Sequence, residues 1–119
     1  MFTQFEPTDA RRAFPCFDEP IYKVPWQITL HVRKEQMALA NTPVISETDE
    51  PGGLKAVRFA ESKPLPSYLV AFAAGPFEAV DAGKVGSTPL RVIVPQGRSG
   101  EAKYAAEVIP QLLRHLVDY

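Results

Sequence analysis

Apolar and polar residues alternate along much of the chain with a period of two, which is typical of half-buried β-strands. The pattern is clearest at residues 24–33, where one face carries Trp26, Ile28, Leu30 and Val32. The opposite face carries Gln27, Thr29, His31 and Arg33. Shorter alternating or apolar runs predict further strands at 37–41, 44–46, 54–61 and 90–94.

A longer apolar run covers residues 67–80 and is interrupted by Gly75-Pro76. It predicts a central strand that is buried on both faces and bends at the Gly-Pro pair. Turn-forming residues cluster at 48–53, with the sequence TDEPGG, and at 81–87, with the sequence DAGKVGS. The 12 prolines are spread along the chain, which favours short strands separated by turns.

The period changes near the end of the sequence. Over residues 99–118 the apolar residues recur at helical spacing, at Ala105, Val108, Ile109, Leu112, Leu113 and Leu116. Ser99 is a candidate N-cap, and Pro110 predicts a kink or a local break. The whole pattern predicts a mainly β fold: an antiparallel β-sandwich or saddle-like sheet of short strands with one C-terminal α-helix.

Composition excludes several classes of partner. The chain has 119 residues, 45% of them hydrophobic, and a net charge of −1. There is no basic surface for nucleic acid. No apolar run reaches the roughly 20 residues that cross a bilayer. The first residues carry no signal-peptide pattern, so we expect a cytoplasmic protein, although the location of a longer parent would not follow from this.

Common catalytic and metal-binding motifs are absent from the sequence. It contains no HExxH, GxSxG, CxxC or glycine-rich phosphate loop. His31 and His115 have no potential ligand at metal-binding spacing, so we predict no catalytic residue, no metal ligand and no cofactor in this chain. A single cysteine, Cys16, excludes an internal disulfide and is predicted to be a small buried apolar side chain.

Residues 3–20, TQFEPTDARRAFPCFDEP, are dense in prolines and charges, which is typical of a shaped loop. Pro7 keeps Glu6 out of helical angles, so the chain before it is predicted to be extended. Gln4 and Glu6 then lie on one face, with Thr3 and Phe5 on the other. A carboxylate beside a neutral amide suits a small cationic group. On the residues alone, a solvated Gln and Glu is the simpler alternative.

The same run resembles a segment of the aminopeptidase N-like zinc metallopeptidases, the gluzincin aminopeptidases. The resemblance continues through KVPWQITLHV, ALANTPVISE and RFAESKPLPSYLVAFAAGPFE, and so covers nearly the whole chain. It implies that Glu6 helps to bind the free amino group of a peptide and that Gln4 lines the pocket for the first side chain. Asp9, Arg11, Arg12 and the Asp18-Glu19-Pro20 turn resemble structural parts, expected to fix the loop by hydrogen bonds and ion pairs.

The resemblance also implies that the chain is an internal piece of a longer enzyme. Residues 1–85 match the second part of an N-terminal β-domain, and residues 86–119 match the first strand and helix of the catalytic domain. The family's GxMEN and HExxH motifs, and with them its zinc, are not in this sequence. We therefore expect an inactive piece whose partners are peptide N-termini and the rest of the catalytic domain.

Two further expectations follow. The apolar stripe of the helix would lack its usual partner in this piece, so we expect self-association through the helix or an exposed sheet edge. The alternative function is a freestanding β-sandwich interaction module without peptidase activity. The gene distinguishes these two functions. A reading frame that continues into GxMEN and HExxH would indicate a piece of a peptidase rather than a freestanding module.

Overall fold

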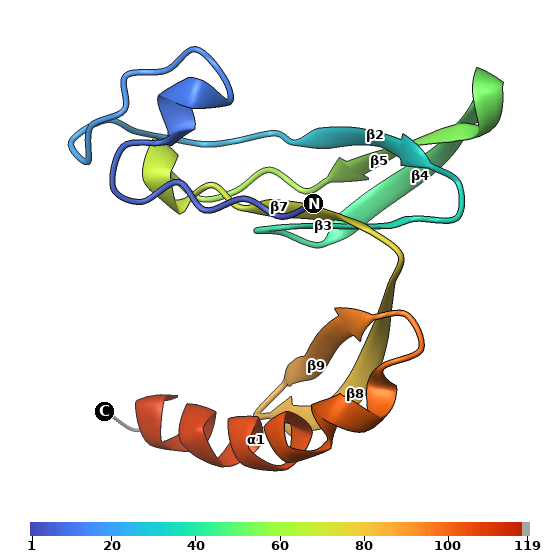
Figure 1. The fold of residues 1–119 in the computed structure, drawn as a ribbon. Coiled ribbons are helices and arrows are strands. Elements are labelled where there is room, and N and C mark those ends of the chain that lie inside the picture. The colour runs from blue at the N-terminus through green and yellow to red at the C-terminus, as the bar shows by residue number, and fades with distance from the viewer. Residues whose placement is uncertain (118–119) are drawn as a thin grey trace. The chain divides into compact units, whose positions relative to one another are not determined.

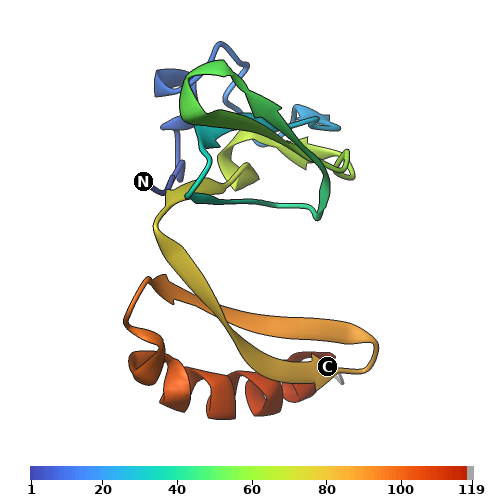
Figure 2. The same ribbon diagram turned by 90° about the vertical axis from the view of Figure 1, so that its right-hand side faces the viewer.

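A computed structural model of the chain describes residues 1–117. Within these residues it contains nine strands and one α-helix, and each strand pairing is antiparallel. The residues form two compact units, Met1–Gly75 and a second that begins at Pro76. The ribbon is drawn in two views (Figures 1 and 2).

The first unit contains seven strands in three small sheets. The largest has the order β2-β5-β4, formed by Thr29–Arg33, Leu54–Phe59 and Val44–Glu50. Strand β3 (Met37–Ala40) pairs with β7 (Phe72–Gly75). Two short strands, β1 (Lys23–Val24) and β6 (Leu65–Pro66), pair with each other.

The core of this unit lies between its two larger sheets. Val32, Val57 and Phe59 come from β2 and β5, and they form one buried cluster with Ala38 of β3 and Ala74 of β7. Val57 and Phe59 are the largest fully buried side chains among the described residues. Residues of two facing antiparallel sheets thus share one core, which confirms the β-sandwich class predicted from the alternating pattern (Figure 1).

A second buried cluster holds the N-terminal segment in place. It consists of Phe5, Ala10 and Val70, with Phe14 and Phe72 among the half-buried side chains packed against them. The ring of Phe5 meets Phe14 and Phe72 edge-on, with centroid separations of 5.7 and 6.0 Å. Cys16 packs against this cluster but is half-buried rather than buried as predicted.

The second unit is a hairpin covered by a helix. Strand β8 (Phe77–Val85) pairs with β9 (Thr88–Pro95), and helix α1 (Lys103–Val117) packs on the hairpin, mainly on β8. Figures 1 and 2 both show the helix running along the hairpin. A short 3-10 turn, Ser99–Ala102, precedes the helix and buries Ala102.

The prediction of one central strand over 67–80 is wrong. Ser67–Leu69 is a 3-10 turn, the sheet strand is limited to Phe72–Gly75, and β8 begins at Phe77. The backbone N–H of Ala71 is taken by the side chain of Asn41 at 2.8 Å, which ends the strand pairing at that point. The apolar run therefore contains a 3-10 turn, strand β7 and the start of strand β8. Its residue pattern has no period that would mark the boundaries between them.

Three boundaries also differ from the predictions. The strand predicted at 24–33 is regular only from Thr29, because the Trp26 N–H bonds the Ser62 hydroxyl instead of a neighbouring strand. The strand predicted at 44–46 continues to Glu50. The turn predicted at 81–87 is mostly strand: Gly83, with φ of +78°, lies within a bulge, and only residues 86–87 separate β8 from β9.

The start of the helical region is also corrected. Arg98 rather than Ser99 lies at the cap position of the 3-10 turn, and its guanidinium pairs with Glu101 at 2.6 and 2.7 Å. Helix α1 runs through Pro110 as one element, so the local break expected there is absent from the described helix.

Candidate functional site

The segment that contains Gln4 and Glu6 runs antiparallel to β7. An isolated bridge joins Phe2 to Ala73, and the N–H of Thr3 bonds the Phe72 carbonyl at 3.0 Å. The Thr3 hydroxyl also accepts the Phe72 N–H at 3.0 Å. The backbone at Phe2 and Thr3 therefore pairs with β7.

Burial alternates along this segment as the sequence predicts. Thr3 is half-buried and Phe5 is 6% exposed, whereas Gln4 and Glu6 are both exposed. The buried Phe5 ring therefore anchors the segment and leaves the two polar side chains on its solvent side.

A pocket of about 210 Å³ lies beside Glu6. It is lined by Glu6, Pro7, Pro20 and Tyr68. The structure thus brings Glu6 together with two residues that are distant in sequence. Gln4 is not part of this lining, so the structure does not bring the two predicted site residues together in this pocket.

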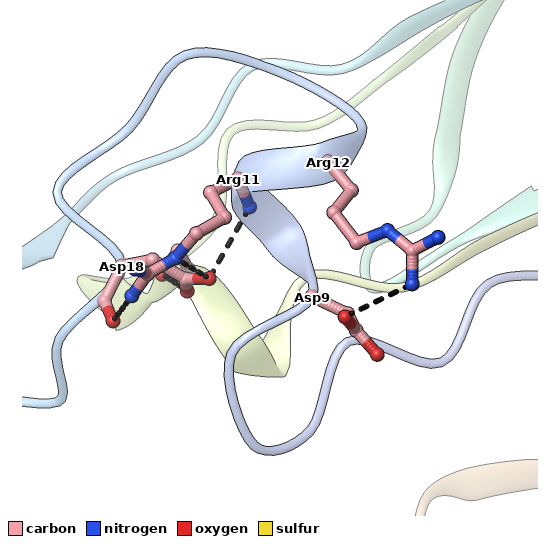
Figure 3. A network of polar contacts seen from close by, with 5 residues as sticks. Asp9, Arg11, Arg12 and Asp18 are labelled. Atoms are coloured by element: carbon pink, nitrogen blue, oxygen red, sulfur yellow. Dashed lines mark hydrogen bonds and ion pairs between the residues drawn. The ribbon is translucent and has the colours of Figure 1, made fainter.

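A buried carboxylate holds the surrounding loop together (Figure 3). Asp18 is 5% exposed, and its Oδ2 accepts the backbone N–H of Arg11 at 3.2 Å and the Arg11 Nε–H at 3.3 Å. Its Oδ1 accepts the hydroxyl of Ser67, which is itself 3% exposed. The Arg11 guanidinium also donates to the Asp18 carbonyl at 3.1 Å. Asp18 thereby joins the loop of residues 9–20 to the turn Ser67–Leu69.

These contacts lower the pKa of the Asp18 carboxyl below its ordinary value. The Ser67 hydroxyl is the largest cause, and the donors of Arg11 add to it, while burial works in the opposite direction. A second ion pair, between Arg12 and Asp9 at 3.4 Å, lies on the surface of the same loop. The interpretation of Asp9, Arg11, Arg12 and Asp18 as residues that fix the loop is confirmed.

The two histidines lie on the surface. His31 Nδ1 is 2.8 Å from Glu50 Oε2, across the solvent face of the β2-β5-β4 sheet, and His115 is exposed on α1. In residues 1–117, His, Cys, Asp and Glu side chains form no group of three that could hold a metal ion. Residues 1–117 therefore offer no set of side chains that fits a zinc site. None of the helices in these residues is long and apolar enough to cross a membrane.

The family model of the peptidase M1 N-terminal domain matches residues 1–69, which is more than half of the chain. The chain belongs to the M1 peptidase family. The match includes Gln4 and Glu6, the Asp18 loop and Tyr68 of the pocket.

Relatives of this M1 chain carry the names of aminopeptidases. It is 44% identical over 117 residues to aminopeptidase M1-A of Oryza sativa, 98% of this chain and 13% of that protein. The puromycin-sensitive aminopeptidase of Caenorhabditis elegans is 47% identical over 107 residues, 89% of this chain and 11% of that protein. Aminopeptidase N of Acetobacter pasteurianus is 37% identical over 119 residues, the whole of this chain and 33% of that protein. The M1 chain thus spans a small part of its relatives.

Sequence reasoning missed Pro20 and Tyr68 as neighbours of Glu6. The sequence predicts Pro20 only as part of a structural turn and Tyr68 only as part of an apolar strand. The Asp18–Ser67 hydrogen bond, between residues 49 positions apart, joins the loop that ends at Pro20 to the turn that contains Tyr68. No local spacing in the sequence carries that information.

Proposed function

We propose that this chain forms part of the substrate-recognition surface of a longer zinc aminopeptidase that removes N-terminal amino acids from peptides. The observation that carries the proposal is the placement of Glu6: an exposed carboxylate, at the edge of a pocket, on a segment anchored by the buried Phe5. Membership of the M1 family and relatives named as aminopeptidases support the reaction class.

In this proposal Glu6 binds the free ammonium group of the peptide. A carboxylate accepts charge-assisted hydrogen bonds from an ammonium, and these are shorter and stronger than bonds between neutral groups. Gln4 is also exposed, and in this proposal it contacts the first side chain of the substrate. Zinc, when present in the longer enzyme, supplies activation of water, but no residue of this chain is assigned to the zinc or to the bond-breaking step.

The proposal includes a place for the chain in the longer protein. Residues 1–85 form the second part of its N-terminal β-domain, and residues 86–119 begin the catalytic domain, whose remainder is the partner of this piece. The division at Gly75-Pro76 describes how this chain packs by itself. A cytoplasmic location stays a prediction.

One experiment tests the assignment of catalysis to residues outside this chain. The purified 119-residue protein is incubated with zinc and a fluorogenic aminoacyl substrate. We expect no metal-dependent turnover, because no cluster in residues 1–117 fits zinc. Turnover above the buffer rate that a chelator abolishes would contradict the assignment.

A second experiment addresses Gln4 in the longer enzyme. Substitution of Gln4 by Ala or Glu should change the ranking of substrates by their first residue more than it changes the mean rate. The measurement is kcat/KM over a panel of aminoacyl substrates. A uniform change over the whole panel, or none, would remove the role of Gln4.

The competing function is a freestanding interaction module. The compact, closed core of the first unit is compatible with such a role. The nucleotide sequence of the gene decides between them: a reading frame that continues into GxMEN and HExxH excludes the module, and a stop codon after Tyr119 favours it.

A further inference from the structure

The wall of the pocket beside Glu6 comes from three separate parts of the sequence. Pro7 follows Glu6 directly, Pro20 ends the loop fixed by Asp18, and Tyr68 lies in the turn Ser67–Leu69. We propose that Tyr68 forms an aromatic wall against which Glu6 holds a primary ammonium group, and that this pocket is already formed in the 119-residue chain. The inference rests on the proposed function and adds to it a ligand-contacting residue.

The chemistry of the lining favours an organic cation. Glu6 supplies the only charged side chain among the four lining residues, and the two prolines have no N–H that could compete for it. The face of a tyrosine ring attracts an ammonium group through its quadrupole. A carboxylate on one side and a ring with two proline surfaces on the others therefore suit an ammonium with a short apolar substituent.

The volume agrees with a ligand of that size. A pocket of about 210 Å³ is several times the roughly 30 Å³ that one water molecule occupies in the liquid. It is large enough for an ammonium group and an adjoining amino-acid side chain.

The position of Tyr68 is set by buried contacts on both sides of it. Ser67 donates its hydroxyl to Asp18, and Val70, which is 3% exposed, packs with Phe5 under the segment that carries Glu6. The turn closes through the Val70 N–H, which bonds the Ser67 carbonyl at 3.1 Å. Pro20 follows Asp18 by two residues, so the same carboxylate fixes two of the four lining residues. Tyr68 itself remains half-buried, with part of its surface accessible.

The test uses the 119-residue chain and two small probes. Leucinamide carries the ammonium group, and N-acetyl-leucinamide has the same side chain without it. Binding of each to the isotope-labelled chain is measured by NMR titration. We expect leucinamide to bind at least about tenfold more tightly than the acetylated probe, since a hydrogen bond to a charged group is at stake.

Variants then distinguish a direct contact between Tyr68 and the ligand from an effect of Tyr68 on folding. Tyr68→Ala should weaken leucinamide binding about threefold to fivefold and leave the acetylated probe unchanged. Tyr68→Phe keeps the ring and should bind as the wild type does. Tyr104→Ala is the matched control, because Tyr104 is 76% exposed on α1 and outside the pocket. An unchanged dispersion of amide signals shows that each variant is folded.

The outcomes distinguish this inference from the proposed function. Equal binding by wild type and Tyr68→Ala, or no binding of leucinamide by the wild type, would overturn the role of Tyr68. Unchanged binding by Glu6→Gln together with weaker binding by Tyr68→Ala would support the aromatic wall and contradict the role of Glu6. Weaker leucinamide binding by both Glu6→Gln and Tyr68→Ala, with Tyr68→Phe and Tyr104→Ala unaffected, is the result we expect.

Discussion

Among the single residues, Ser67 has the clearest energetic role. Its hydroxyl bonds the buried Asp18 carboxylate, and both residues are nearly inaccessible to solvent. Ser67→Ala should lower the free energy of unfolding of the first unit by about 2 kcal/mol, since it removes a hydrogen bond to a charged group. Urea denaturation measures the change. Ser99→Ala, at an exposed position, is the control and should stay within about 0.5 kcal/mol of wild type; an equal effect of both would contradict the role of Ser67.

The lowered pKa of the Asp18 carboxyl predicts that the stability of the folded chain depends on pH. Its pKa in the folded chain is lowered from the ordinary value of 3.8, chiefly by the Ser67 hydroxyl. A lowered acid pKa contributes stability above the unfolded-state value, and that contribution is lost as the pH falls below 3.8 toward the folded-state pKa. The stability gap between wild type and Asp18→Asn should therefore be constant well above pH 3.8 and shrink as the pH falls below it. A gap that does not change with pH would refute this interpretation.

The sequence predicted the role of some residues better than others. The exposure of Gln4 and Glu6 agrees with the period of two, which is a local feature. The partners of Arg11 were expected only as a class, and Tyr68 was not recognised at all. Contacts between residues 49 positions apart arise from the packing of whole elements, which a single sequence does not specify.

The strands and helices were predicted well wherever the residue pattern was regular. Strands β2, β3, β5 and β9 lie within the predicted ranges or differ from them by a few residues. The errors concentrate in residues 67–80, where a continuous apolar run offers no period to divide it. They also include the bulge at Gly83, whose positive φ lets a strand continue through residues that resemble a turn.

Helix α1 provides a prediction at the level of one element. Pro110 lies inside the helix and cannot donate the hydrogen bond that its position requires. Pro110→Ala should raise the free energy of unfolding of the second unit by about 1–3 kcal/mol. Hydrogen exchange of the helix amides measures this change in the free energy of unfolding. Gln111→Ala, at an exposed neighbour, should change it by less than about 0.5 kcal/mol; a destabilised Pro110→Ala would mean that ring packing outweighs the missing bond.

The whole chain is expected to self-associate through the outer side of α1. Leu112 and Leu116 are 57% and 72% exposed there, one helical turn apart. Because they form an apolar surface, Leu112→Glu combined with Leu116→Glu should convert associated protein to monomer. Light scattering after size-exclusion chromatography is the measurement. Gln111→Glu changes charge on the same helix and should leave association intact; a wild type that stays monomeric at high concentration would contradict the expectation.

In the first unit, Met1–Gly75, buried contacts surround the segment that carries Glu6. Two buried clusters, the Asp18 contacts and the turn Ser67–Leu69 hold a short extended segment, and Glu6 lies exposed at its end. The β-sandwich and the M1 family could be predicted from the sequence, because both follow from long patterns. The pocket could not, because it is assembled from residues that only the fold brings together.

The central claim is that Glu6 binds the substrate's amino group, and one measurement tests it most directly. In the longer M1 enzyme, kcat/KM is compared for wild type and Glu6→Ala, with the exposed Glu19→Ala as the matched control. Loss of a hydrogen bond to a charged group costs about 1.5–3 kcal/mol, so kcat/KM should fall roughly 10-fold to 150-fold and KM should rise. Kinetics of Glu6→Ala that match those of wild type and Glu19→Ala would contradict the claim.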